Sequence, residues 1–229
     1  MKRIGLLGGM SWESSIEYER VLNEEIRRRL GGTHSADLIV RSYDFAVIED
    51  LQQGGRWGEA GELLAADAAR LQAAGAELVA ICTNTMHLLA DVVSEAIDVP
   101  LVHLVDVAAD AVVAAGLDTV GLLGTRYTME HTFYRDRLAD AGPTVLVPDE
   151  PDRTVVHDVI YDELVRGIVR PESRAAYLGI IDRLAARGAG GVVAACTEIE
   201  LLVTAADLDV PYFPTTRLHA EAIVDAALA

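Results

Sequence analysis

Short apolar runs alternate with longer amphipathic stretches along the whole chain, and no low-complexity segment interrupts them. Eight runs rich in aliphatic and β-branched residues have the length of strands: 3–7, 37–42, 78–82, 101–103, 119–123, 144–147, 192–195 and 212–213. Such runs between helical segments are typical of a parallel sheet that helices cover on both faces. The pattern therefore predicts the α/β class.

Two amphipathic stretches show where helices begin and end. Ser14 and Glu17 form a capping-box pattern ahead of three apolar side chains on one helical face, and Gly31 ends that stretch. The three apolar side chains are Leu22, Ile26 and Leu30. A second helix is predicted over 59–74, with Gly75 as its stop.

The two halves of the chain repeat three short strings at nearly constant spacing. Ile4–Gly9 resembles Val120–Thr125, Gly75-Ala76 recurs as Gly188-Ala189, and Asp98–Pro100 recurs as Asp209–Pro211. We therefore expect two pseudo-symmetric lobes, each a mostly parallel sheet flanked by helices, with the active site in the cleft between them. Lobe 1 is predicted to cover 1–104, completed by a C-terminal helix at 215–229, and lobe 2 to cover 105–214.

Composition limits the kinds of partner and the compartment. The chain has 229 residues, 51% of them hydrophobic, which is enough for a sizeable core. Its formal net charge of −17 disfavours nucleic acid and anionic membranes as partners, and no apolar run is long enough to cross a membrane. Two cysteines and no secretory signal predict a reducing, cytoplasmic location.

The basic residues exclude two common kinds of cofactor chemistry. Lys2 is the only lysine, so the chain has no interior lysine for a pyridoxal phosphate Schiff base and no phosphate-binding P-loop. No spacing of Cys and His matches a metal site. We therefore expect no cofactor and no metal, and a small molecule as the partner.

Four polar loops follow the predicted strands at 8–11, 82–85, 124–128 and 196–198. Open α/β folds bind ligands at the carboxyl ends of their strands. These loops are rich in small hydroxyl and amide groups and in backbone N–H groups at predicted helix starts, which can bind a carboxylate. The same N–H groups would lower the pKa of a thiol there and favour the thiolate.

Cys82 and Cys196, the only cysteines, are each open to two interpretations. A free cysteine is most often a small buried hydrophobe, which we favour for Cys82, whereas we favour a catalytic thiol for Cys196. A spacing of 114 residues aligns the two cysteines, but the Gly-Ala spacing of 113 places Thr83 opposite Cys196. Because adjacent strand residues point to opposite faces, this difference decides which side chain enters the cleft, and the repeat alone leaves it open.

Other polar residues carry weaker alternatives. His87 is either a satisfied helix histidine or a support for the site, and His103 and His219 could be polar supports in the cleft. Glu198 is either a carboxylate stabilised at a helix start or a partner that tunes Cys196.

The strings at 8–14, 82–87, 124–130 and 196–198 together resemble the cofactor-independent aspartate/glutamate racemase family over essentially the whole chain. They are most similar to its atypical L-aspartate/glutamate-specific and broad-specificity amino-acid racemases. The resemblance implies an isomerase of amino-acid metabolism that interconverts L- and D-amino acids, and family members are commonly homodimers.

The resemblance also implies a mechanism in which two thiols flank the substrate Cα. In the first motif, Thr83 stands directly before Asn-Thr where the typical family member has cysteine. Cys196 would then be the main base and Thr83 the opposing proton donor. A threonine hydroxyl is far too weakly acidic to abstract a proton as readily as a thiol, so we expect unequal rates in the two directions.

The residues implied in substrate binding come from both halves of the chain: Met10, Gln52, Asn84, Thr85, Thr125, Thr197 and Glu198. Typical aspartate racemases carry a Pro-Asp-Arg segment after the second strand, and this chain has Asp44–Ile48 there instead. The preferred amino acid therefore stays open among aspartate, glutamate and a neutral one. Two other functions are possible on these residues: a thiol-dependent isomerase or decarboxylase of small dicarboxylic acids, and a non-catalytic amino-acid binder.

Overall fold

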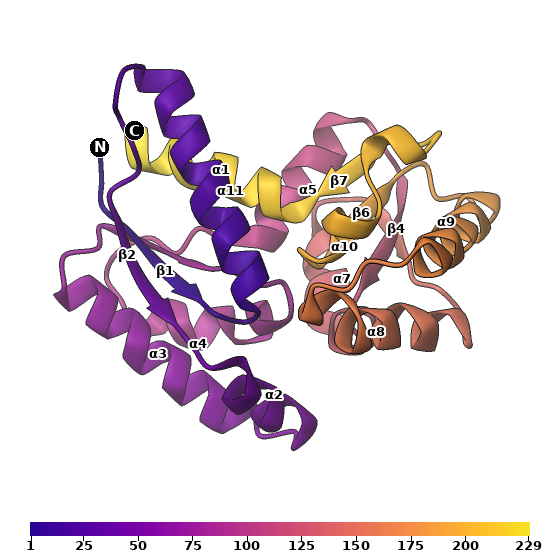
Figure 1. Ribbon diagram of the computed structural model, residues 1–229, viewed down its shortest axis with the longest axis horizontal. Helices are drawn as coiled ribbons and strands as arrows, with labels where there is room; N and C mark the ends of the chain where they lie inside the picture. The colour runs from indigo at the N-terminus through magenta and orange to yellow at the C-terminus, as the bar shows by residue number, and fades with distance from the viewer. The chain divides into compact units, whose positions relative to one another are not determined.

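The computed structural model describes all 229 residues and divides the chain into two compact units (Figure 1). Unit 1 consists of Met1–His103 and His219–Ala229, and unit 2 of Leu104–Leu218. Each unit contains one parallel sheet with helices packed on both faces, which confirms the predicted α/β class. None of the helices has both the length and the apolar character needed to cross a membrane.

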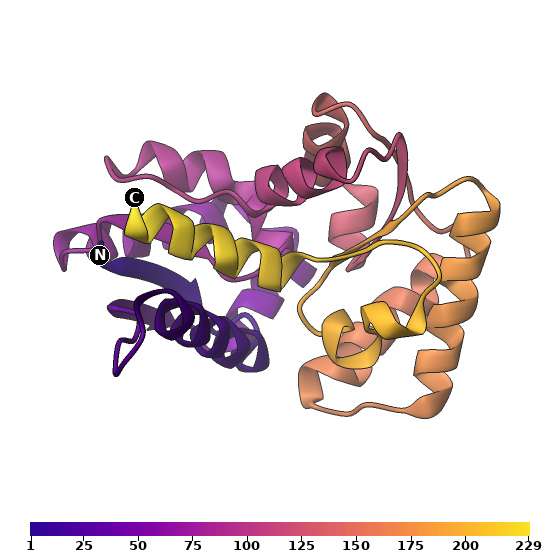
Figure 2. The same cartoon turned by 90° about the horizontal axis from the view of Figure 1, so that it is seen from above.

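Unit 1 contains a three-stranded sheet in the order β2-β1-β3. Its elements are β1 (Ile4–Gly8), α1 (Trp12–Leu30), β2 (Leu38–Ser42), α2 (Phe45–Gln53), α3 (Trp57–Ala73), β3 (Leu78–Ile81), the 3₁₀ helix η1 (Thr85–Leu89), α4 (Ala90–Glu95) and most of α11 (Thr215–Leu228). Helices α1 and α11 cover one face, where they lie side by side (Figure 2), and α2, α3 and α4 cover the other.

Unit 2 contains a four-stranded parallel sheet in the order β5-β4-β6-β7. Its elements are α5 (Leu104–Ala114), β4 (Thr119–Gly124), α6 (Arg126–Glu130), α7 (Thr132–Asp140), β5 (Thr144–Leu146), α8 (Asp152–Asp162), η2 (Leu164–Arg166), α9 (Pro171–Ala186), β6 (Val192–Ala195), α10 (Ile199–Leu202), η3 (Ala205–Asp207) and β7 (Tyr212–Pro214). Helices α5 and α7 pack on one face, and α6, α8, α9 and α10 on the other.

The repeated glycines let a helix lie close to the central strand of each sheet. A Cβ atom at Gly5 would lie 2.9 Å from the Cβ of Ala76 and 3.3 Å from that of Leu71. A Cβ atom at Gly121 would lie 3.0 Å from the Cδ1 of Leu184. Leu71 and Leu184 are separated by the same 113 residues as the repeated Gly-Ala pair, so the sequence repeat corresponds to one helix–strand contact made twice.

The substitution Gly5→Ala is expected to lower the free energy of unfolding by about 1–3 kcal/mol, because the new methyl group meets Cβ atoms that are fixed to the backbone. Gly121→Ala is the matched control and should cost less, since the end of the Leu184 side chain can rotate away. Urea unfolding of both variants measures the difference. An equal or larger loss for Gly121→Ala would contradict this account of the packing.

Two sequence predictions about local structure are wrong. The strand expected at 101–103 is reduced to a single bridge between Leu101 and Val79, because the chain enters α5 at Leu104. The N-cap of the first helix is Ser11, whose hydroxyl accepts the backbone N–H of Ser14, so the helix begins before the predicted capping box.

The helix predicted over 59–74 is confirmed as α3, with Gly75 following it at a φ of 100°. Gly188 follows α9 at the equivalent place with a φ of 102°. At both positions the backbone adopts a left-handed conformation that favours glycine, which explains why the chain repeats Gly-Ala there.

Candidate active site

In unit 1, a sharp turn follows the carboxyl end of β1. A Cβ atom at Gly9 would lie 2.3 Å from the backbone nitrogen of Tyr43, and the φ of Gly9 is +80°, so this position requires glycine. The next residue, Met10, is buried in the apolar cluster that also contains Met86. The turn therefore places Met10 in the same cluster as the loop that follows β3.

The loop after β3 contains two of the predicted substrate-binding residues, and a third residue, from α2, contacts it. Asn84 and Thr85 are buried where η1 begins. Gln52 is buried as well, and its Nε2 donates to the Sδ of Met86 over 3.2 Å. Gln52 from α2 thus contacts the residue directly after Thr85.

Strand pairing shows which residue after β3 corresponds to Cys196, which follows β6. The equivalent pairs between the central strand and its neighbour are Gly5–Val79 in unit 1 and Gly121–Val192 in unit 2. Since Gly5 and Gly121 are matched positions of the repeat, the register of the two sheets follows the spacing of 113 residues. Thr83 is therefore the structural counterpart of Cys196, and Cys82 is the counterpart of Ala195.

Cys82 is fully buried on the face of the sheet that α1 and α11 cover. Burial, with a smaller contribution from the charge of Glu19, raises the pKa of the Cys82 thiol well above its ordinary value. Thr83 is only half-buried, and its backbone carbonyl accepts a hydrogen bond from the Nδ1 of His87 over 2.7 Å. Cys82 thus packs as a core side chain, and His87 holds the backbone of the next residue.

In unit 2, the two central strands end side by side. Gly124 of β4 pairs with Ala195 of β6, and the residues that follow directly are Thr125 and Cys196. Thr125 is buried and caps α6, where its Oγ1 accepts the backbone N–H of Thr128 over 3.3 Å. The sheet therefore brings two of the predicted site residues of this unit together at the carboxyl ends of its central strands.

Cys196 donates a hydrogen bond from its Sγ to the Oε2 of Glu198 over 2.9 Å. Burial, and then the negative charge of Glu198, raise the pKa of Cys196 well above its ordinary value. A backbone N–H at Glu198 does lower this pKa, as expected, but burial and the Glu198 charge outweigh it, so the expected net lowering of the pKa is wrong. The protein thus holds a neutral thiol against a carboxylate that can accept its proton, and Thr197 between them is also buried.

The predicted role of His219 as a support in the cleft is not what the structure shows. His219 is fully buried in unit 1, where its Nε2 donates to the carbonyl of Val102 and its Nδ1 accepts from the hydroxyl of Tyr18, both over 2.8 Å. Burial lowers its pKa to about 4, so it is a neutral core histidine at physiological pH. The ring of His103 lies 4.9 Å from that of His87, which supports the loop of Thr83.

A further group at the end of β4 was not among the predicted site residues, although it includes two residues of the predicted polar loop 124–128. The backbone N–H of Arg126 donates to the Nδ1 of His157 over 3.2 Å, and the rings of Tyr127 and Tyr161 lie 6.1 Å and 4.7 Å from that imidazole. Arg126 lies in the polar loop 124–128 and directly follows the predicted site residue Thr125, and these are the signals in the sequence that point to it.

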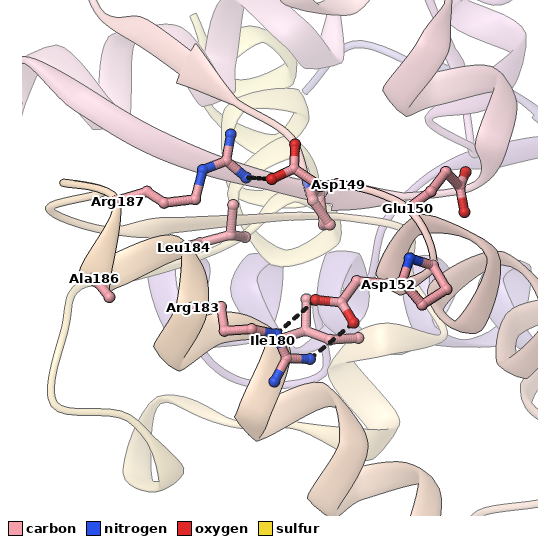
Figure 3. A pocket seen from close by; sticks show the side chains of 10 residues that line it. Asp149, Glu150, Asp152, Ile180, Arg183, Leu184, Ala186 and Arg187 are labelled. Carbon is pink, nitrogen blue, oxygen red and sulfur yellow. Dashed lines mark hydrogen bonds and ion pairs between the residues drawn. The ribbon is translucent and has the colours of Figure 1, made fainter.

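A cavity of about 460 Å³ in unit 2 lies between α9 and the loop after β5 (Figure 3). Arg183 pairs there with both carboxylate oxygens of Asp152, at 2.6 Å and 2.8 Å, and Arg187 pairs with Asp149 at 3.4 Å. The cavity has no thiol, hydroxyl or imidazole group among its lining residues. It is therefore a poor candidate for proton transfer, and the strand-end residues are the better one.

Few groups could hold a cofactor. The only lysine, Lys2, donates from its Nζ to the carbonyl of Ala226 at an exposed position ahead of β1, at the opposite end of that strand from Met10. No group of three or more His, Cys, Asp or Glu side chains is arranged to bind a metal ion.

The structure thus places a thiol paired with a carboxylate, and hydroxyl and amide groups, at the strand ends of two matched α/β units. The chain belongs to the Asp/Glu/hydantoin racemase family, whose family model matches residues 7–223. This membership makes the protein an enzyme of the racemase class and confirms the resemblance found in the sequence.

Two solved structures and one curated relative are similar over most of the chain. A candidate Asp/Glu racemase from Yersinia pestis is 49% identical, with a TM-score of 0.93 and all of both chains covered. An aspartate racemase homologue from Pyrococcus horikoshii is 30% identical, with a TM-score of 0.87 and the same coverage. The broad-specificity amino-acid racemase RacX of Bacillus subtilis is 22% identical over 166 residues, which are 71% of this chain and 70% of RacX.

The fold also occurs in a different kind of enzyme. The structure of a mutant of arylmalonate decarboxylase is 14% identical, with a TM-score of 0.56. The match covers 99% of this chain and 94% of the decarboxylase chain. At this identity the likeness concerns the fold alone.

Proposed function

We propose that the protein is an amino-acid racemase that works without pyridoxal phosphate, by removing a proton from one face of the substrate Cα and delivering one to the other. The observation that carries the proposal is the 2.9 Å hydrogen bond from the Cys196 thiol to Glu198. Membership of the racemase family and the likeness to RacX support the reaction class.

Cys196 is the main base in this proposal, and Glu198 activates it. The thiol passes its proton to the Glu198 carboxylate, and the resulting thiolate removes the α-proton of the substrate and becomes a thiol again. Because burial disfavours the thiolate in the free protein, ionisation would accompany substrate binding, when the substrate ammonium group adds a positive charge nearby.

Thr83 is the proposed donor on the opposite face. Its hydroxyl gives a proton to the carbanion and regains one from water, and Glu198 releases its proton to water, so that protons balance over one turnover. Donation to a carbanion that is a stronger base than an alkoxide is favourable for a hydroxyl. Abstraction instead requires the alkoxide to be present beforehand, and a threonine hydroxyl is too weakly acidic to supply it at neutral pH.

The remaining site residues would hold the substrate's α-carboxylate and ammonium groups. Met10, Asn84 and Thr85 would do so from unit 1, and Thr125 and Thr197 from unit 2. Backbone and side-chain donors aimed at the α-carboxylate would stabilise the negative charge that develops as the proton leaves.

A chiral chromatography screen of the twenty L-amino acids with the purified protein tests the proposal. We expect the D-enantiomer of at least one amino acid to accumulate without any added cofactor. Release of CO₂ from a dicarboxylic acid would instead indicate a decarboxylase, and binding with neither product would indicate a non-catalytic amino-acid binder. The homodimer, which the family resemblance implies, and the cytoplasmic location, which the cysteine content predicts, both stay predictions.

A further inference from the structure

We propose that Arg126 is a specificity-determining residue that selects substrates with an acidic side chain, by pairing its guanidinium with the side-chain carboxylate. The inference rests on the proposed racemase function and names its substrate class as an acidic amino acid. Typical aspartate racemases carry an arginine after the second strand, in the segment that this chain replaces with Asp44–Ile48. Arg126 lies instead in unit 2, just after β4.

The guanidinium of Arg126 is available for a ligand. Arg126 is exposed, and its side chain makes no hydrogen bond or ion pair, in contrast to most arginines of this acidic chain. Its backbone N–H donates to His157, which fixes the point of the chain from which the side chain extends. An unpaired guanidinium is an unusual feature in a chain with a net charge of −17, where carboxylates are abundant.

Arg126 also lies at the carboxyl end of the sheet, where Cys196 follows β6. It comes directly after Thr125, and β4 and β6 are neighbouring parallel strands that end with Gly124 and Ala195 paired. Neighbouring strands are about 4.8 Å apart, and an extended arginine side chain is longer than this spacing. A substrate held beside the Cys196 thiol would therefore be within reach of the guanidinium.

The arginine at the carboxyl end of the sheet in unit 1 is already paired with groups of the protein. Arg41, near the end of β2, pairs with the buried Asp67 at 2.9 Å, donates to the carbonyl of Ser42 at 2.6 Å and lies 4.3 Å over the ring of Tyr43. Gln52, the polar candidate that follows, offers only an amide. A bidentate pair with a carboxylate is therefore open to Arg126 and not to Arg41.

The overall charge makes such a local cation favourable for an acidic substrate. A net charge of −17 repels a dicarboxylate, and a nearby unpaired positive group would offset that repulsion at the site more strongly than neutral N–H donors. A neutral amino acid has no such need. Removing Arg126 should therefore affect acidic substrates far more than their amide analogues.

The test compares Arg126→Met with the parent protein on glutamate and aspartate and on their isosteric amides, glutamine and asparagine. We expect kcat/KM for the acidic substrates to fall by about 10- to 100-fold relative to kcat/KM for the amides, the range of a charge-assisted hydrogen bond. Arg126→Lys should restore part of the ratio. Arg27→Met is the matched control, since Arg27 is another exposed arginine without an ion pair, on α1, and should leave the ratio as it is.

Calorimetry with glutarate, a dicarboxylate that cannot racemise, gives a readout that does not depend on turnover. We expect Arg126→Met to weaken glutarate binding by a similar factor. Equal losses for acidic and amide substrates, or unchanged glutarate affinity, would overturn the inference. If no amino acid is racemised at all, the proposed function fails, whereas racemisation with an unchanged acid-to-amide ratio overturns only the role of Arg126.

Discussion

Replacing Cys196 by serine is expected to reduce racemisation by about 10²- to 10⁴-fold, the usual contribution of a positioned acid–base group. Serine is nearly isosteric and can still donate a hydrogen bond to Glu198, so the geometry at the end of β6 should persist. The loss would arise because a hydroxyl cannot ionise where a thiol can. Steady-state rates by chiral chromatography measure the effect, with circular dichroism to check the fold.

Cys82→Ala is the matched control for this experiment. Cys82 is fully buried against α1 and α11, with its pKa raised by burial, and it corresponds to Ala195 in unit 2. Alanine at position 82 should therefore keep most of the rate. If Cys82→Ala loses activity as severely as Cys196→Ser while remaining folded, the assignment of the two thiols would be incorrect.

The second large effect concerns Glu198→Gln, which should change thiol ionisation and turnover in opposite directions. The Glu198 charge helps to raise the pKa of Cys196, so removing this charge lowers the pKa and shifts formation of the thiolate to lower pH. Alkylation of Cys196 by iodoacetamide should then become faster at a given pH. Racemisation should nevertheless fall by about 10²-fold, because the proton of the thiol has lost its acceptor.

The labelling and the turnover are measured on the same preparations, in a Cys82→Ala background so that only one thiol reacts. Glu198→Asp serves as the control that keeps a carboxylate, and it should retain more activity than Glu198→Gln. If the amide variant turns over faster as its thiolate becomes more accessible, Glu198 hinders catalysis and the proposed activation is wrong. If alkylation and turnover both slow down, Glu198 serves a structural role.

The sequence allowed the arrangement of the core to be predicted but not its electrostatics. Apolar runs located the seven strands of the structure, and the spacing of Gly75 and Gly188 indicated the register that strand pairing then showed for Thr83 and Cys196. These features depend on periodicity and backbone conformation, which are local properties of the chain. The strand expected at 101–103 failed because the length of an edge strand depends on where the next helix begins.

The state of the thiol could not be predicted, because it depends on burial and on side-chain contacts that only the fold creates. A loop at a helix start favours a thiolate, yet the pKa of Cys196 is raised by the surrounding apolar cluster and by Glu198. His219 was misjudged for the same reason, since its partners Tyr18 and Val102 are far away in the sequence. Arg126, in the predicted polar loop 124–128, was not chosen as a site residue because an unpaired arginine can be recognised only when all ion pairs are known.

The central claim is that two unlike residues, Cys196 and Thr83, transfer protons at opposite faces of one carbon. Enantiomers have equal free energies in water, so kcat/KM must be equal in the two directions, and the inequality has to be sought at saturating substrate. The most direct measurement is the initial rate of α-proton exchange for each pure enantiomer in D₂O, followed by NMR. We predict unequal saturated rates, with faster exchange for the enantiomer whose α-proton faces Cys196; equal rates would contradict the account.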